Sequence, residues 1–387
     1  MKLYDVCIRA FVKGNLGDDL FIVTLCGRYP GTSFVMCGEK QYRRIFEKIP
    51  NLKYITTDTF FHKWFLRGRN LIPLLRNRLG KNRQGGEIHP LCRWNDFLPK
   101  ISRRCVLISG SIFMELGQGE FSPTGYYKNE EKYYGRHPYV IGCNFGPYHN
   151  EEYRLFYEKR FREAAQVCFR ESYSLGLFPD SGLQWAPDIL FQTDKGLAQQ
   201  PEERDYVLVS VVNVEKDEEA GAGALQAAYE QALERLLGRL LAEGEHIVLL
   251  GFCNAQGDDK IIRRLLERFP GQEGLAGYYY SDISYGQALG YLAGAKTIVA
   301  SRYHAMILGW LWGRKVLPVV YSAKMLHVIE DLAPEAEYVL PQQWMEDRDI
   351  LVKSYRKMLD GTSAPELAEA VTAAGRHFAE LDKVLKL

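Results

Sequence analysis

The stretch KTIVASRYHAMILGWLWGRKVLPVVY, residues 296–321, reads as a strand, a helix and a second strand. Two short runs of Val, Ile and Leu flank a longer apolar segment, which starts after Ser301, a good helix cap, and stops at Gly313. Continuous apolar runs of this kind are typical of parallel strands that are covered on both faces. The stretch therefore predicts one strand–helix–strand unit of a parallel sheet.

The same alternation of short apolar runs and longer amphipathic segments recurs along most of the chain. Residues 223–245 and 258–271, for example, carry apolar side chains at helical spacing between two apolar runs. Strands are expected at 4–11, 32–37, 105–111, 139–146, 164–171, 206–213, 246–252, 296–301 and 315–321. Alternating strands and helices predict an α/β protein with doubly wound parallel sheets.

The alternation occurs twice, on either side of a polar stretch at 191–205 that has no apolar periodicity. The length of 387 residues also exceeds the size at which one hydrophobic core usually stops growing. We therefore predict two doubly wound domains, at 1–190 and 205–340, that face each other across a cleft. Residues 341–387 are expected to form helices that cross back to the first domain.

Composition and charge exclude several classes of protein. The 49 Lys and Arg residues balance 48 Asp and Glu residues, so the overall charge does not favour nucleic acid as a partner. The eight histidines and eight cysteines show no metal-ligand spacing, so no metal or other cofactor is expected, with the acidic pair Asp258 and Asp259 as the one exception to test.

The sequence also predicts a cytoplasmic protein. Its cysteines are unpaired and several lie inside expected strands, its start does not resemble a leader, and it has no apolar run of about 18 residues.

Ligands of doubly wound sheets bind beyond the carboxyl ends of the strands, so the loops that follow the strands are candidate sites. The first such loop, GNLGDD, combines Gly14, Asn15 and Gly17 with the carboxylate of Asp18. Its glycines permit a tight turn, and either Asp18 or Asp19 could simply cap the following helix. The loop lacks both the Gly-x-Gly-x-x-Gly spacing of dinucleotide sites and the Gly-Lys-Ser/Thr of phosphate-binding loops.

Two later strands of the first domain end in small or amide-bearing residues. Gly110 and Ser111 follow one of them, and Asn144 and Gly146 follow the other. Residues of this kind suit the lining of a cleft, although each is also an ordinary turn residue. Arg170 ends a further apolar run, where the simpler interpretation is a surface salt bridge.

An arginine and a histidine open the apolar helix of the second domain. With Ser301 as the expected N-cap, Arg302 and His304 lie in the first helical turn. A cation there opposes the helix dipole unless a bound anion compensates it, and such a local conflict is expected at a functional site. Lys324 follows the next strand, either as a solvated lysine or as a third cation of the same site. Together these residues predict a pocket for a phosphate or a carboxylate.

In these motifs the sequence resembles the polysaccharide pyruvyltransferase family. The strongest stretch is 286–332, in which Arg-x-His opens a helix and the following strand leads to Tyr-x-x-Lys. The GNLGDD loop is similar to the family's Gly-Asn-x-Gly-Asp motif, and CNFGPY at 143–148 is similar to a middle block. A further block contains Arg170, Glu171, Ser172, Pro187 and Asp188.

The resemblance implies a GT-B arrangement of two Rossmann-like domains, with the acceptor on the first and the donor on the second. The implied reaction needs no metal: pyruvate passes from phosphoenolpyruvate to two hydroxyls of a sugar, in a cell-surface polysaccharide or its lipid-linked precursor, and leaves a cyclic ketal and phosphate. His304 would be the general acid and Asp18 the general base. The donor would be bound by Ser301, Arg302, Arg170 and Lys324. The acceptor side of the cleft would be lined by Gly14, Asn15, Gly17, Gly110 and Asn144.

Two other functions remain open at this point. A GT-B glycosyltransferase would share the architecture and would place the diphosphate of a nucleotide sugar at the same helix N-terminus. It usually needs a carboxylate that holds a ribose, and no clear one lies near 301–325. A binding protein without activity could also keep the fold, although the joint presence of Arg302, His304 and Asp18 argues against it.

Residues 60–86 form the one strongly unbalanced segment of the chain. Seven Lys and Arg residues are interleaved with Trp, Phe, Leu and Ile, and no acidic residue occurs there. This composition is typical of a surface that lies in a membrane interface, but it also fits a basic helix packed on the domain. If the acceptor is an oligosaccharide on a polyprenyl diphosphate, the segment would contact both the inner membrane face and the diphosphate. We therefore expect peripheral membrane contact through this segment.

Overall fold

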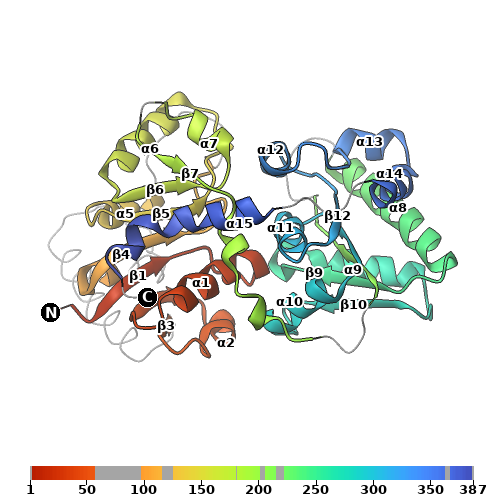
Figure 1. The fold of residues 1–387 in the computed structure, drawn as a ribbon, viewed down its shortest axis with the longest axis horizontal. Helices are drawn as coiled ribbons and strands as arrows, with labels where there is room; N and C mark the ends of the chain where they lie inside the picture. The colour runs from red at the N-terminus through yellow and green to blue at the C-terminus, as the bar shows by residue number, and fades with distance from the viewer. Residues whose placement is uncertain are drawn as a thin grey trace, which may run out of the picture.

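The structure is a computed structural model that describes residues 2–56, 97–115, 125–179, 181–200, 205–214, 222–361 and 367–385. In this part of the chain, two separate sheets lie side by side, each with helices packed around it (Figure 1). Every strand pairing among these residues is parallel. The predicted α/β class with two doubly wound, Rossmann-like domains is confirmed.

Within the described residues, the first sheet has seven strands in the order β3-β2-β1-β4-β5-β6-β7. Its strands are β1 (Tyr4–Arg9), β2 (Phe34–Gly38), β3 (Leu52–Thr56), β4 (Ser102–Ile108), β5 (Tyr139–Cys143), β6 (Gln166–Phe169) and β7 (Gln184–Trp185). Its helices are α1 (Leu16–Arg28), α2 (Arg43–Phe46), α5 (Gly125–Tyr134), α6 (Glu151–Glu163) and α7 (Ser172–Gly176). Val6 and Cys7 are successive residues of β1, so their side chains point to opposite faces of the sheet. They belong to two different core clusters, so this sheet is buried on both faces, as its unbroken apolar runs predict.

The second sheet, in the ranges that the structure describes, has five strands in the order β10-β9-β8-β11-β12. Its strands are β8 (Val207–Ser210), β9 (Ile247–Gly251), β10 (Leu275–Tyr279), β11 (Thr297–Ala300) and β12 (Lys315–Pro318). Its helices are α8 (Ala222–Ala242), α9 (Asp258–Arg268), α10 (Tyr285–Gly294), α11 (Tyr303–Leu311), α12 (Ala323–Leu332), α13 (Pro341–Glu346) and α14 (Ile350–Asp360). Each sheet starts in its middle and grows first to one side and then to the other. The order therefore reverses between β1 and β4 and again between β8 and β11, and such reversal points are where these folds bind ligands.

Three strands were not expected from the sequence. β3 and β10 are edge strands, and every residue of β10 is only partly buried. Edge strands do not need the unbroken run of large apolar residues on which the prediction of strands relied. β7 is an edge strand of two residues, which is too short to give a pattern. The nine expected strands are present, with ends shifted by a few residues.

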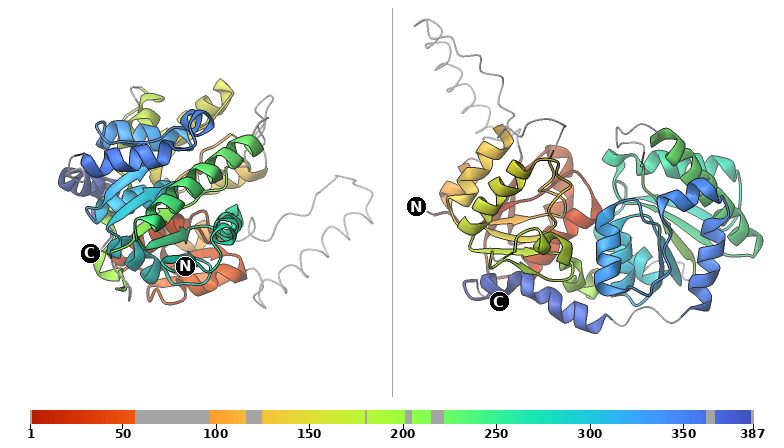
Figure 2. Two further views of the ribbon diagram at one scale, coloured as in Figure 1. Left: turned by 90° about the vertical axis from the view of Figure 1, so that its right-hand side faces the viewer. Right: turned by 90° about the horizontal axis from the view of Figure 1, so that it is seen from above.

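The segment 341–387 divides between the two domains. α13 and α14 pack on α8 of the second domain, where Trp344 is fully buried. Residues 367–385, the return segment, contain α15 (Ala368–Ala374), the 3-10 turn η5 (Gly375–Phe378) and α16 (Ala379–Asp382). This segment runs back along the first domain, as the blue helix in Figures 1 and 2 shows. It is held there by Arg28 and Tyr29, which both bind the carboxylate of Asp382.

The two domains share one apolar interface. Phe21 of α1, Leu190 of the 3-10 turn η2 (Ile189–Gln192) and Met306 of α11 belong to a single continuous core cluster. Apolar contact of this kind opposes relative motion of the two domains, which carry the loops at the two reversal points. No helix among the described residues combines the length and the apolar character needed to cross a membrane.

Candidate active site

A cavity of about 320 Å³ lies between the two domains. Loops that follow β1, β4 and β6 of the first sheet line one side, and loops that follow β8, β9, β11 and β12 of the second line the other. Both reversal points of the strand order therefore open into the same cavity. Seven of the predicted site residues line it: Asn15, Asp18, Gly110, Arg170, Arg302, His304 and Lys324.

The other four predicted residues lie behind these. Gly17 packs directly under the ring of His304, and Asn144 binds the guanidinium of Arg170. Gly14 has a positive φ of 66° and makes the turn before α1. Ser301 is fully buried, and its Oγ accepts a hydrogen bond of 2.7 Å from the hydroxyl of Tyr229. Ser301 is therefore not the N-cap that the sequence predicted. Arg302 takes that position, and its side chain makes no capping hydrogen bond to the helix.

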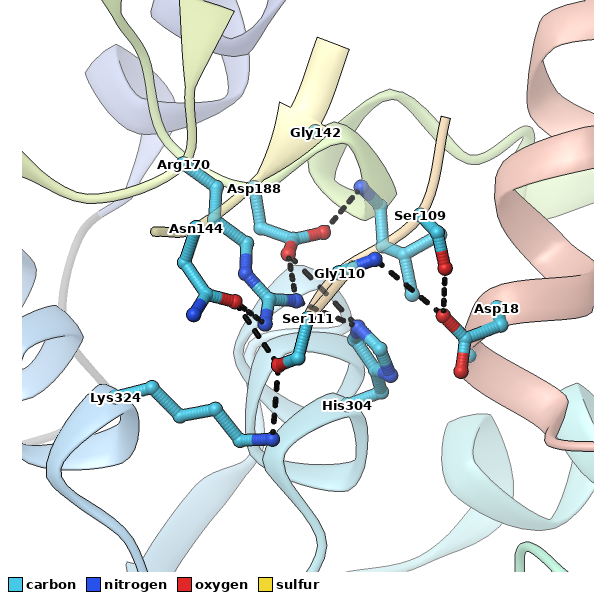
Figure 3. Close-up of polar contacts among 12 residues, drawn as sticks. Asp18, Ser109, Gly110, Ser111, Gly142, Asn144, Arg170, Asp188, His304 and Lys324 are labelled. Carbon is cyan, nitrogen blue, oxygen red and sulfur yellow. Dashed lines mark hydrogen bonds and ion pairs between the residues drawn. The ribbon is translucent and has the colours of Figure 1, made fainter. Parts of the chain in front are cut away.

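His304 lines the cavity from the start of α11, and Figure 3 shows it beside Arg170 and Asp188. Its Nε2 lies 3.2 Å from the NH1 group of Arg170 and 3.9 Å from the carboxylate of Asp188. Because a guanidinium can only donate, Nε2 accepts this hydrogen bond and the imidazole is neutral, with its proton on Nδ1. Burial, followed by the charges of Arg170, Lys324 and Arg302, lowers the pKa of His304 well below its ordinary value.

Arg170 connects His304 to the first domain. It is almost fully buried, and its NH1 and NH2 groups also donate to Asp188 at 3.3 Å and to Asn144 at 2.6 Å. Its guanidinium lies over the ring of Tyr303, 4.2 Å from the centroid. The surface salt bridge that was the simpler interpretation is therefore wrong for this residue, which belongs to a buried network with the carboxylate of Asp188 as its counter-ion.

Asp18 faces the cavity from the first turn of α1. Asn15 is the N-cap of this helix, since its side chain accepts from the backbone N–H of Gly17, so neither aspartate has the capping role considered above. The Asp18 carboxylate accepts hydrogen bonds from the Ser109 hydroxyl at 2.7 Å and from the Gly110 backbone at 3.4 Å. Burial raises the pKa of Asp18 even though these hydrogen bonds oppose the shift.

Arg302 has a counter-ion within the protein. Its guanidinium makes a two-point ion pair with Asp258 at the start of α9, and both side chains are buried. The Asp258 carboxylate also accepts from the backbone N–H groups of Phe252 and Cys253. The conflict between Arg302 and the helix dipole is thus compensated by Asp258, and a bound anion is not required to explain it.

Lys324 approaches the cavity from the first turn of α12. Its Nζ lies 3.4 Å from the Ser111 hydroxyl and 5.8 Å from the ring centroid of Tyr321. The charges of Lys324 and Arg302 lower the pKa of Tyr321 against the opposing effect of burial. The expected set of cations beside His304 is therefore present in Arg170, Arg302 and Lys324, although only Lys324 lacks a carboxylate partner in the described residues.

The block around Arg170 also joins the two domains. Ser172 donates from its backbone and its hydroxyl to the two oxygens of Asp331 on α12, at 2.8 and 2.5 Å. Glu171 lies 3.6 Å from Nδ1 of His327 on the same helix. Arg170, which contacts His304, is thus followed directly in the chain by two residues that contact α12 of the second domain.

Asp188, Asp258 and Tyr321 also belong to the site, although the sequence analysis did not predict these positions for them. Asp188 and Tyr321 stand in motif blocks already noted, and those blocks were the available signal. Asp258 was considered only as a possible metal ligand, and its pairing with Arg302 could not be predicted because the two residues are 44 positions apart in the chain. In the described ranges, no group of three or more His, Cys, Asp or Glu side chains could hold a metal ion, so Asp258 and Asp259 do not form such a group there.

Comparisons with known proteins bear on both the family and the fold. The family model described as "Polysaccharide pyruvyl transferase" matches residues 65–323, which is more than half of the chain. Among curated proteins, none is significantly similar in sequence.

Solved structures share the fold at very low sequence identity. The UDP-GlcNAc 2-epimerase of Methanocaldococcus jannaschii is 11% identical, with a TM-score of 0.55 over 98% of this chain and 99% of that chain. A putative UDP-N-acetylglucosamine 2-epimerase from Listeria monocytogenes is 10% identical, with a TM-score of 0.54 over 100% of both chains. Anabaena HepE, in complex with UDP and glucose, is 9% identical, with a TM-score of 0.52 over 97% of this chain and 95% of that chain. These similarities show the GT-B fold.

Proposed function

The chain belongs to the polysaccharide pyruvyl transferase family, and from this membership we propose that it transfers pyruvate from phosphoenolpyruvate to two hydroxyls of one sugar. The products are a cyclic ketal and phosphate. The observation that best supports this proposal is the position of His304, which lines a cavity with three cations and contacts Arg170 of the first domain.

The reaction needs one proton donor and one proton acceptor. A proton must reach C3 of phosphoenolpyruvate so that C2 becomes electrophilic and a sugar hydroxyl can attack it. The C2–O bond to phosphate then breaks, and the neighbouring hydroxyl attacks C2 in turn. The two hydroxyls release two protons, of which one replaces the proton used at C3 and the other leaves with phosphate or solvent.

We assign the donation to His304 and its charging to the arrival of the donor. In the structure its Nε2 is occupied by the hydrogen bond from Arg170. A carboxylate or phosphate that draws the guanidinium of Arg170 away would free Nε2 and offset the positive charges around it, which raises the pKa of the imidazole. Asp188, at 3.9 Å, would then stabilise the imidazolium. His304 would thus become an acid only when the donor is bound.

Asp18 is our proposed general base. It faces the cavity from the first domain, where the acceptor would lie beside Asn15 and Gly110. A carboxylate whose pKa is raised by burial is a stronger base than an exposed one, so its environment suits the removal of a hydroxyl proton. In this arrangement acid and base approach the substrates from opposite domains.

Lys324 is the cation best placed to bind the donor's phosphate. We expect Lys324→Ala to raise the KM for phosphoenolpyruvate about tenfold, because one charge-assisted contact is lost, with little change in the melting temperature. Lys353→Ala, at an exposed lysine of α14, is the matched control and should leave KM unchanged. An unchanged KM in both variants would place the phosphate elsewhere.

The proposed reaction is tested by phosphate release from phosphoenolpyruvate with a panel of free and lipid-linked glycosides. Phosphate release that depends on a glycoside, together with a pyruvate ketal in the product, supports the proposal. Thermal stabilisation by nucleoside diphosphates, but not by phosphoenolpyruvate, would instead favour a glycosyltransferase. Tight donor binding without phosphate release with any acceptor would favour a binding protein.

We further propose that the acceptor is an oligosaccharide on a polyprenyl diphosphate and that the protein works at the cytoplasmic membrane face. This proposal rests on the composition of residues 60–86, which lie outside the described residues. Clustered Lys and Arg near an anionic leaflet contribute about 1 kcal/mol each, so even partial engagement would suffice for binding.

Changing Arg67, Arg69, Arg76 and Arg78 to Glu is therefore expected to abolish salt-sensitive binding to anionic vesicles. Activity on a soluble acceptor should remain, and activity on a lipid-linked acceptor should fall. The same charge change at four exposed cations of the second domain controls for net charge: Arg235, Arg348, Lys353 and Lys357. Equal sedimentation of wild type and the Arg67 to Arg78 variant with vesicles would contradict the proposal.

A further inference from the structure

His377 of the return segment is a buried polar residue that lies beneath the site. It has no exposed surface, and both of its ring nitrogens are hydrogen bonded to the backbone of the first domain. Nδ1 accepts from the N–H of Gly142 at 3.3 Å, and Nε2 lies 3.0 Å from the carbonyl of Pro187, to which it donates. One imidazole therefore joins two segments that are 45 residues apart in sequence.

These two segments carry the groups that hold Arg170. Gly142 precedes Cys143, whose carbonyl accepts from the Arg170 backbone N–H at 2.9 Å. Pro187 precedes Asp188, the counter-ion of the Arg170 guanidinium. The hydrogen bonds of His377 thus fix the backbone on both sides of Arg170, one residue away from each contact.

The protonation state of His377 is also fixed. Burial lowers its pKa to about 4, so the ring is neutral at ordinary pH. Only the tautomer with its proton on Nε2 makes both hydrogen bonds, since Gly142 donates and Pro187 accepts. His377 is therefore a rigid bridge between these two segments, and it has no free nitrogen with which to take part in proton transfer.

We propose that His377 is a positioning residue for the reaction: through Pro187 and Gly142 it sets the distance between Asp188 and Arg170, and through Arg170 the orientation of His304. The inference rests on the proposed function of that network. A shift of about 1 Å in a reacting group can cost about 100-fold in rate, so a bridge one residue away from Asp188 affects the chemistry without touching a substrate.

The simpler explanation is that His377 only anchors the return segment. The chain offers a matched control for it, because Asp382 anchors the same segment through Arg28 and Tyr29 and makes no hydrogen bond to the backbone around Arg170. If anchoring alone matters, loss of either contact should have the same effect. If positioning matters, only the change at His377 should affect the site.

The test compares His377→Phe, His377→Gln and Asp382→Asn in the full chain. Phe keeps an aromatic ring, somewhat larger than imidazole, and removes both hydrogen bonds, whereas Gln can donate and accept. We expect His377→Phe to lower kcat at least 30-fold, with a KM for phosphoenolpyruvate within about threefold of the wild-type value. His377→Gln should have a kcat within about fivefold of wild type. Asp382→Asn should have a kcat within about threefold of wild type. Equal losses in His377→Phe and Asp382→Asn, or a kcat within threefold in His377→Phe, would overturn the proposal. If His377→Phe does not fold, His377→Asn replaces it, with an expected loss of about tenfold.

A readout without substrate separates this inference from the proposed reaction. In ¹⁵N-histidine spectra of the unliganded protein, His377→Phe should shift the imidazole signals of His304, and Asp382→Asn should leave them in place. This result would support the positioning role even if the wild type released no phosphate from phosphoenolpyruvate. Unchanged His304 signals in His377→Phe would refute it whatever the reaction is.

Discussion

His304→Gln is expected to lower kcat by about 1,000-fold or more while the dissociation constant of phosphoenolpyruvate changes less than about tenfold. Gln can still accept the hydrogen bond that Arg170 gives to Nε2, so the polar network of the unliganded site is kept. It cannot carry a transferable proton at any accessible pH, and that is the step assigned to His304. The measurement is single-turnover phosphate release, combined with calorimetric titration of the donor.

An exposed histidine provides the control for this variant. His246 lies on the surface before β9, so His246→Gln should leave both kcat and donor affinity unchanged. A loss of less than about tenfold in His304→Gln would show that another group protonates the donor. Tyr321, whose phenol lines the same cavity between two cations, would then be the next residue to change.

Gly17→Ala is expected to have the second largest effect, although it adds only one methyl group. A Cβ at Gly17 would lie 1.7 Å from Nδ1 of His304 and 2.2 Å from its Cγ, well inside contact distance. Either the imidazole must turn away from Arg170 or α1 must move away from α11. We expect kcat to fall at least 100-fold and the free energy of unfolding to fall by about 1–3 kcal/mol, which stopped-flow assays and urea unfolding would measure.

The same helix contains its own control. Gly27 lies in the last turn of α1, and a Cβ there would meet no atom within 4 Å. Gly27→Ala should therefore leave kcat unchanged and should stabilise the protein slightly, by up to about 1 kcal/mol, because alanine favours a helix. If Gly17→Ala behaved like Gly27→Ala, the close packing of His304 on α1 would not matter for activity.

The sequence was sufficient to predict the fold because both sheets are built from central strands buried on two faces. Such strands need unbroken runs of Val, Ile and Leu, as in KTIVA and HIVLL, and these runs are visible without any partner. Edge strands carry weaker constraints, which is why β3, β7 and β10 were missed. The division of residues 341–387 between two domains could not be predicted either, since α14 and α15 are both ordinary amphipathic helices and differ only in the surface that they meet.

The site was partly predictable for a similar reason. Asp18, Arg170, His304 and Lys324 all follow strands, and parallel strands bring their carboxyl ends to one edge of the sheet. What local sequence could not reveal was pairing over a long distance. Arg302 looked like an uncompensated cation because its partner Asp258 follows a different strand, and Ser301 looked like a cap because its partner Tyr229 lies on α8.

The path of the return segment has a consequence for how the protein is made. The fully buried side chains of His377, Phe378 and Leu381 pack on the first domain. In the sequence, however, the whole second sheet comes after η2 and before these three residues. A ribosome that adds about 5–20 residues per second needs roughly 10–40 s to pass from residue 192 to residue 377. During that time the first domain lacks the return segment, which covers part of its apolar surface in the finished structure. It is therefore completed only after the second domain has been synthesised, and a nascent chain stalled within residues 205–361 should expose apolar surface on the first domain to chaperones.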